Sequence, residues 1–153
     1  MFAAVAALVF TRFYSTTAAR YTAARTYSLN WRVTIPDGYN MVCHYESDHG
    51  FHGDGYRYTV FEARQNGVVG VGRDVSAGIS EIETGAASSD EGLDCEIANF
   101  IDEVSKKLEI RDEDAVTLSS GSRWKRLKKD NGSMLAIISD VLASHVYFAE
   151  KLL

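Results

Sequence analysis

The sequence predicts a single α+β domain in which an antiparallel sheet of about five to seven strands is covered by one amphipathic helix. Several segments alternate between apolar and polar residues, and turn signals rich in Gly, Asn and Asp separate them. One further segment, residues 93–108, repeats its apolar residues at the spacing of a helix. The 153 residues are enough for one domain with a hydrophobic core.

Charge divides the chain into two parts. The net charge of −5 argues against a dedicated nucleic-acid-binding protein, which usually needs a basic surface. Residues 1–36 nevertheless contain four arginines and no acidic residue. We therefore interpret residues 1–28 as an N-terminal targeting, anchor-like or disordered segment, and residues 29–153 as the domain.

The first residues leave three interpretations open. The ten apolar residues 1–10 are too few to span a membrane, which takes about 20. They fit a short signal-peptide core, although no charged region precedes them. The following Arg, Ser, Thr and Ala residues also fit an organellar transit peptide. A frayed helix in front of the domain is the third interpretation.

Alternation with a period of two predicts the first strands. In LNWRVTIP the apolar residues Leu29, Trp31, Val33 and Ile35 alternate with polar ones, and Pro36-Asp37-Gly38 then forms a turn. The third predicted strand carries large side chains on both faces, which predicts a central position. Asn66-Gly67 is a strong hairpin signal in front of VVGV. The predicted strands cover residues 29–36, 39–46, 56–63 and 68–71, with a possible short strand at 79–83.

The second half begins with the predicted helix, 93–108, which we expect to lie across the sheet. A possible short strand follows at 114–118. The basic run Arg123–Lys129 resembles a solvated strand edge, and Asp130-Asn131-Gly132 signals a turn. Residues 140–153 also show helical spacing, but we expect a terminal hairpin that pairs Met134–Ser139 with His145–Lys151.

Residues that can do chemistry are densest in DHGFHGDG, between the second and third predicted strands. Imidazole and carboxylate groups are common ligands of zinc and other divalent transition metals, and the three glycines would let the backbone fold them together. The spacing matches no familiar metal motif. A structural or ligand-contacting turn is the favoured interpretation, ahead of a metal site and of acid–base chemistry by histidine. The candidate residues are Asp48, His49, His52 and Asp54.

Two cysteines, Cys43 and Cys95, lie in different predicted elements. A secreted setting could join them as a disulfide, and a cytosolic one would leave them as buried thiols. The basic run 123–129, with Trp124 inside it, could also contact phosphate, anionic lipid or an acidic partner. The chain has no nucleophile elbow, no P-loop and no dinucleotide-binding fingerprint.

The stretch Asp48–Gly55, followed by YRYTVFEA, resembles a set of small uncharacterised bacterial proteins of the Firmicutes type, which carry an HGGFHGDG-like turn between two strands. The later Trp124-Lys125-Arg126-Leu127 is similar to their second half. The resemblance implies an α+β domain outside the cytoplasm and near a membrane, behind an N-terminal anchor. It implies no activity.

Together these observations favour a non-catalytic, envelope-associated binding or accessory domain that uses the 48–55 turn as its recognition loop. It would need no cofactor, and its partner, a protein or a small molecule, is unknown. The alternative is a metal-dependent hydrolase that holds zinc or another divalent transition metal at Asp48, His49, His52 and Asp54. Membrane proximity through residues 1–28 and 123–129 favours a membrane-associated or secreted protein. An organellar or cytoplasmic location is the alternative.

Overall fold

The computed structural model describes residues 20–36, 38–47, 54–63, 70–71, 79–86, 95–116, 122–140 and 144–153. A first helix occupies residues 20–31. The elements that follow are β1 (Val33–Thr34), β2 (Tyr39–Glu46), β3 (Gly55–Ala63), β4 (Gly70–Val71), β5 (Ile79–Ala86), α2 (Cys95–Leu108), a 3-10 turn (Asp112–Asp114), β6 (Arg123–Lys129), β7 (Met134–Asp140) and β8 (His145–Leu152).

Six strands form one antiparallel sheet in the order β2-β3-β8-β7-β6-β5. The α+β class, the antiparallel sheet and its covering helix are therefore confirmed. The terminal hairpin is confirmed as well, because β7 pairs with β8 over its whole length. The strand 56–63 is interior, as predicted, since β3 lies between β2 and β8.

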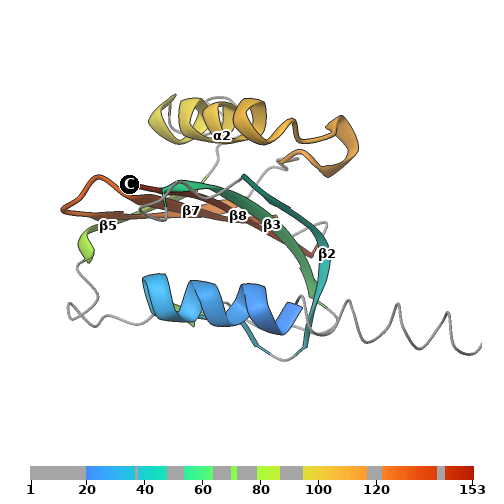
Figure 1. Cartoon of the computed structure of the whole chain (residues 1–153). Helices are drawn as coiled ribbons and strands as arrows, with labels where there is room; N and C mark the ends of the chain where they lie inside the picture. Colours follow the sequence, from blue (N-terminus) through green and yellow to red (C-terminus); the bar gives the residue numbers. More distant parts are fainter. Residues whose placement is uncertain are drawn as a thin grey trace, which may run out of the picture.

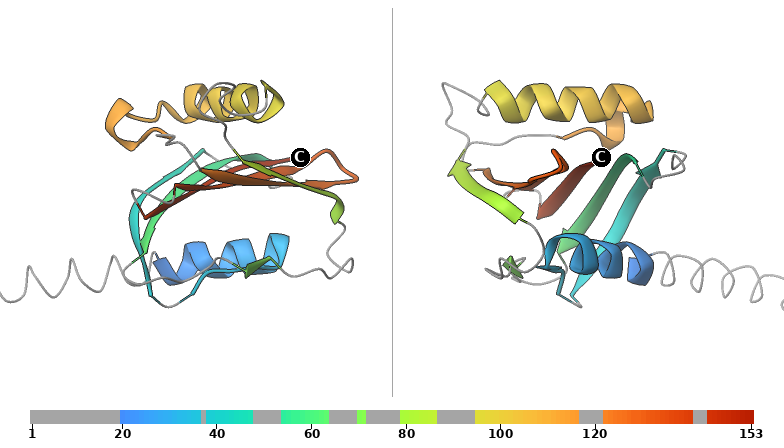
Figure 2. Two further views of the ribbon diagram at one scale, coloured as in Figure 1. Left: turned by 180° about the vertical axis from the view of Figure 1, so that it is seen from behind. Right: turned by 60° about the vertical axis from the view of Figure 1, so that its left-hand side comes forward.

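The sheet is covered on both faces, which the sequence analysis did not predict. Helix α2 lies on one face, and the helix of residues 20–31 lies on the other (Figures 1 and 2). On the α2 side, Tyr58 and Val60 of β3 pack with Ile97, Phe100 and Val104 of α2. On the opposite side, side chains of the first helix complete a second core.

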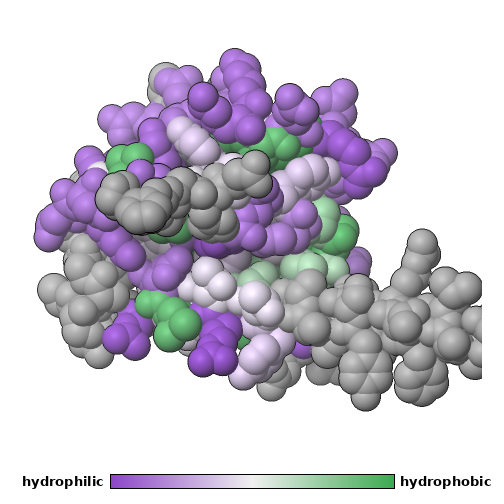
Figure 3. All heavy atoms as spheres, viewed as in Figure 1, coloured by the Kyte–Doolittle hydropathy of each residue, from purple (hydrophilic) through white to green (hydrophobic). Residues whose placement is uncertain are grey.

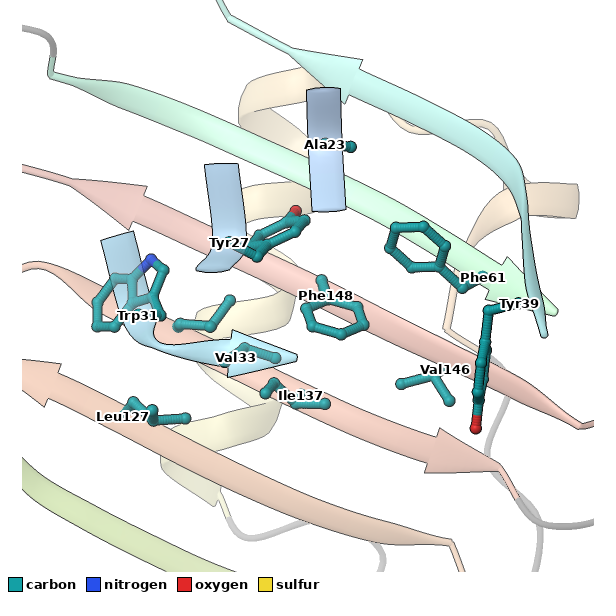
Figure 4. Close-up of a cluster of buried hydrophobic side chains, with 11 residues drawn as sticks. Ala23, Tyr27, Trp31, Val33, Tyr39, Phe61, Leu127, Ile137, Val146 and Phe148 are labelled. Atoms are coloured by element: carbon teal, nitrogen blue, oxygen red, sulfur yellow. The ribbon is translucent and has the colours of Figure 1, made fainter. Parts of the chain in front are cut away.

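The predicted strand over 29–36 is wrong, because residues 29–31 belong to the first helix and only Val33 and Thr34 pair as β1. Ala23, Tyr27 and Trp31 recur at intervals of four and so share one helix face. All three are buried, and they point from the helix toward the sheet (Figure 4). The boundary predicted at residue 29 thus cuts through a helix that is part of the core.

Aromatic rings make up the centre of this second core. Tyr27 and Phe148 lie with ring centroids 4.7 Å apart, and Phe61 meets Phe148 edge-on at 5.4 Å. Arg32 directly follows the first helix; it has a left-handed φ of 55° and donates its N–H to the carbonyl of Ser28. This turn brings the chain back into β1.

Two smaller predictions about pairing are also wrong. β4 pairs with β1 in a separate two-stranded sheet, whereas Asn66-Gly67 predicted a hairpin with the strand before it. Both edges of β3 are already occupied by β2 and β8, so β4 cannot pair there. Of the strand predicted at 114–118, residue 114 belongs to the 3-10 turn, residues 115–116 are not in a strand, and 117–118 lie outside the described residues.

Candidate functional site

Most of the predicted site falls where the structure gives no description. Asp48, His49 and His52 lie outside the described residues, whereas Asp54 is exposed immediately before β3. Within the described part of the chain, no three His, Cys, Asp or Glu side chains are grouped so that they could hold a metal ion. The metal-site interpretation of Asp48, His49, His52 and Asp54 therefore stays a prediction.

The structure does describe the base from which this turn projects. The register of β2 and β3 ends at Glu46 opposite Arg57. Next to this pair, the Ser47 N–H donates to the Tyr56 carbonyl at 3.0 Å, and the Tyr56 N–H donates to the Ser47 hydroxyl at 2.8 Å. These bonds fix the positions at which the chain enters and leaves the turn.

Arg57 is the centre of a polar network at this base. Its side chain is buried on the face of the sheet that the first helix covers. The guanidinium forms ion pairs with Glu46 on β2 and with Glu150 on β8. Arg57 Nε also donates to Glu46 at 2.9 Å. Because the guanidinium binds two carboxylates from neighbouring strands, it joins three strands at one point.

Glu150 connects this network to the first helix. It is fully buried, and it accepts hydrogen bonds from the indole N–H of Trp31 and, at 3.4 Å, from the Asn30 amide. A buried carboxylate needs such donors, because water is no longer there to solvate its charge. The Lys129 ammonium lies 4.6 Å from the centroid of the Trp31 ring, next to the same carboxylate.

A second branch runs from Tyr27 to His44. The hydroxyl of buried Thr59 is bonded to the Tyr27 hydroxyl at 2.9 Å and to His44 Nδ1 at 2.8 Å. His44 Nε2 lies 3.6 Å from Glu46. Burial is the main reason why the pKa of His44 is lowered, and it also raises the pKa of Tyr27. Both side chains are therefore uncharged at neutral pH.

At the base of the hairpin, ion pairs and hydrogen bonds within the protein therefore hold the charged side chains. Arg57 directs its donors to two carboxylates, and Glu150 is surrounded by donors. Because the Arg57 guanidinium bonds to carboxylates of the protein, its role is to hold in place the strands that carry the turn. None of Tyr27, Trp31, Arg57, Thr59 and Glu150 was predicted to be a site residue. The signal was a charged residue inside an otherwise apolar strand, as in GYRYTVF and HVYFAE.

A second polar cluster lies under the segment that follows α2. The Tyr45 hydroxyl donates to Asp114 at 2.5 Å, and Arg111 donates to the same carboxylate. Burial, and next the Asp114 carboxylate, raise the pKa of the neighbouring Cys43 thiol to about 11. Cys43 therefore remains a thiol at neutral pH and is a poor nucleophile.

The possible disulfide between Cys43 and Cys95 is not formed, because Cys43 carries a free thiol. Cys43 lies on β2 beside Asp114, a residue that follows the C-terminal end of α2. Cys95 is the first residue of that helix. Its neighbour Glu96 pairs with Arg126 on β6. In the sheet, β2 and β6 are four strand spacings apart, roughly 19 Å.

The basic run 123–129 is confirmed as a strand, but it is not an edge strand. β6 lies between β5 and β7, and the acidic residues of β5 stand opposite its basic ones in the register. Glu83 is opposite Arg126, and Glu81 is opposite Lys128.

None of the described helices is long and apolar enough to cross a membrane. The comparisons with known proteins add no relative: no protein-family model, no curated protein and no solved structure matches this chain.

Proposed function

We propose that this protein is a non-catalytic binding or accessory domain that presents the turn of residues 48–55 as its recognition loop. The observation that carries the proposal is the buried Arg57, which ties Glu46 and Glu150 together at the base of that turn. A loop held at both ends by a rigid scaffold is a common place for binding residues. Association with the cell envelope rests on the resemblance alone and stays part of the proposal.

Site-specific photo-crosslinking in the native host tests this function. A photoreactive phenylalanine analogue would replace Phe51 in the loop, and a matched control would replace Asp130 in the β6–β7 turn, which lies at the same end of the sheet. We expect a discrete crosslinked partner from position 51 and none from position 130. The same products at both positions, or none from position 51, would count against a recognition loop.

Metal analysis separates this proposal from the hydrolase alternative. Elemental mass spectrometry of the purified full chain would be compared with a folded His49→Ala/His52→Ala variant. A binding loop predicts no stoichiometric metal in either protein. One equivalent of zinc, iron or manganese that disappears in the variant would instead make the hydrolase the better explanation.

A further inference from the structure

The first helix carries two exposed apolar side chains on its outer face. Tyr21 and Leu29 are exposed to 67% and 64%, the two most exposed of the large apolar side chains in the described residues. The core-facing positions Ala23, Tyr27 and Trp31 are buried, so the helix is apolar on its inner face as well. In the lower part of Figure 3, hydrophobic and hydrophilic side chains lie side by side over this helix.

The charge of this helix layer is opposite to that of the far side of the molecule. Residues 20–36 contain three arginines and no acidic residue, whereas residues 95–116 contain seven acidic and three basic residues. The two segments lie on opposite faces of the sheet (Figures 1 and 2). Among the described elements, the first helix is thus basic, and α2 with the turn that follows it is acidic.

Two of the three arginines are placed to meet a surface. Arg25 and Arg32 are exposed, and Arg25 lies one helical turn from both Tyr21 and Leu29. Arg20 donates a hydrogen bond to the Pro36 carbonyl and so holds the helix to the segment that follows. The outer face thus combines an aromatic ring, an aliphatic side chain and the Arg25 guanidinium, and exposed Arg32 directly follows the last helical residue.

We propose that this outer face docks on the surface of an anionic phospholipid bilayer. Guanidinium groups bind lipid phosphates and carboxylates, while a tyrosine and a leucine enter the interface between headgroups and acyl chains. The acidic α2 side would then face away from the lipid. At physiological ionic strength, charges are screened over about 8 Å, so the acidic side contributes little repulsion. This inference does not rest on the recognition loop.

Vesicle binding tests the proposal with the full chain. Vesicles of phosphatidylcholine alone would be compared with vesicles of equal parts phosphatidylcholine and phosphatidylserine, by co-sedimentation at several salt concentrations. We expect binding only to the anionic vesicles, and weaker binding as salt rises. Since one basic residue near such a surface contributes roughly fivefold in affinity, Arg25→Gln/Arg32→Gln should weaken binding roughly 25-fold.

Matched controls change the same groups elsewhere. Lys106→Gln/Lys107→Gln removes two exposed positive charges from α2 and should leave vesicle binding unchanged. Tyr21→Ser/Leu29→Ser should weaken binding, whereas Val42→Ser/Leu153→Ser, which removes two other exposed apolar side chains, should not. Circular dichroism confirms that each variant is folded.

Three outcomes would overturn the proposal. The first is a full chain that does not bind anionic vesicles or binds both kinds equally. The second is a loss of binding of similar size in the α2 control and in the arginine variant. The third is a dimer, measured by light scattering, that Arg25→Gln/Arg32→Gln dissociates while vesicle binding is absent, because the helix would then meet the acidic side of a second copy.

Discussion

At the scale of single residues, the most consequential side chain is Arg57. It forms ion pairs with Glu150, which is fully buried, and with Glu46, which is partly exposed. Arg57→Met leaves the Glu150 carboxylate buried without its counter-ion. We expect this variant to lose about 3–5 kcal/mol of free energy of unfolding, measured by urea denaturation.

A double variant provides the control for this expectation. Arg57→Met/Glu150→Met removes both buried charges, and well-packed apolar side chains can replace a buried ion pair at little cost. The double variant should therefore be more stable than Arg57→Met alone. If both variants were equally unstable, the loss would come from packing of the Arg57 side chain and not from an uncompensated charge.

The lowered pKa of His44 should make the free energy of unfolding depend on pH. Burial lowers its pKa in the folded protein, so as pH falls the unfolded chain takes up a proton before the folded one does. The contribution of neutral His44 is thus complete above its unfolded pKa of about 6.5 and is lost as pH falls below that value. Its slope is at most about 1.4 kcal/mol per pH unit.

The comparison that isolates this contribution is wild type against His44→Gln. The free energy of unfolding would be measured for both proteins across the histidine range, about pH 5 to 8. The glutamine side chain can still bond Thr59 but cannot take up a proton. The variant should show a flatter pH dependence, and parallel curves for the two proteins would contradict the assignment.

At the scale of elements, the residue that follows α2 has a strained backbone conformation. Glu109 follows the helix with a left-handed φ of 50°, and Ile110 then donates its N–H to the Ser105 carbonyl. Glycine is the residue best suited to this position. Glu109→Gly should raise the free energy of unfolding by about 1 kcal/mol, whereas Glu109→Ala should give no gain. Thermal denaturation of the two variants distinguishes these effects.

The sequence predicts elements well where one period dominates. The alternation in YNMVCHYE and YRYTVFEA predicted β2 and β3, and the spacing of three and four predicted α2. Residues 29–35 fit two periods at once. An alternating strand would bury Trp31 and Val33 on one face. A helix that ends at Trp31, followed by a short strand that begins at Val33, buries the same two residues, and this is the observed arrangement. The competing signal was Ala23, Tyr27 and Trp31, spaced by four.

The candidate site was only partly predictable. His44 and Glu46 precede the turn in the sequence, and the structure places both at its base. Glu150 could not have been assigned to them, since a partner 93 residues from Arg57 in the chain is fixed only by the order of strands. No local pattern contains that order.

At the scale of the whole molecule, the first helix belongs to the folded body. A chain that begins at residue 29 lacks Ala23 and Tyr27, and so uncovers the rings of Phe61 and Phe148. We expect it to lose its cooperative thermal transition and to bind a hydrophobic dye. A chain that begins at residue 20 keeps these contacts and is the matched control. A cooperative transition in both would contradict this role for the helix.

The position of β8 bears on how the protein is made. β8 follows all the other described elements in the chain, yet it lies between β3 and β7 in the middle of the sheet. A growing polypeptide on the ribosome therefore cannot close its sheet until residues 145–152 have left the exit tunnel. Until then β3 and β7 have open edges, which are ready templates for pairing with other chains. The sheet should thus close only after β8 has emerged, on the millisecond-to-second scale of sheets built from distant segments.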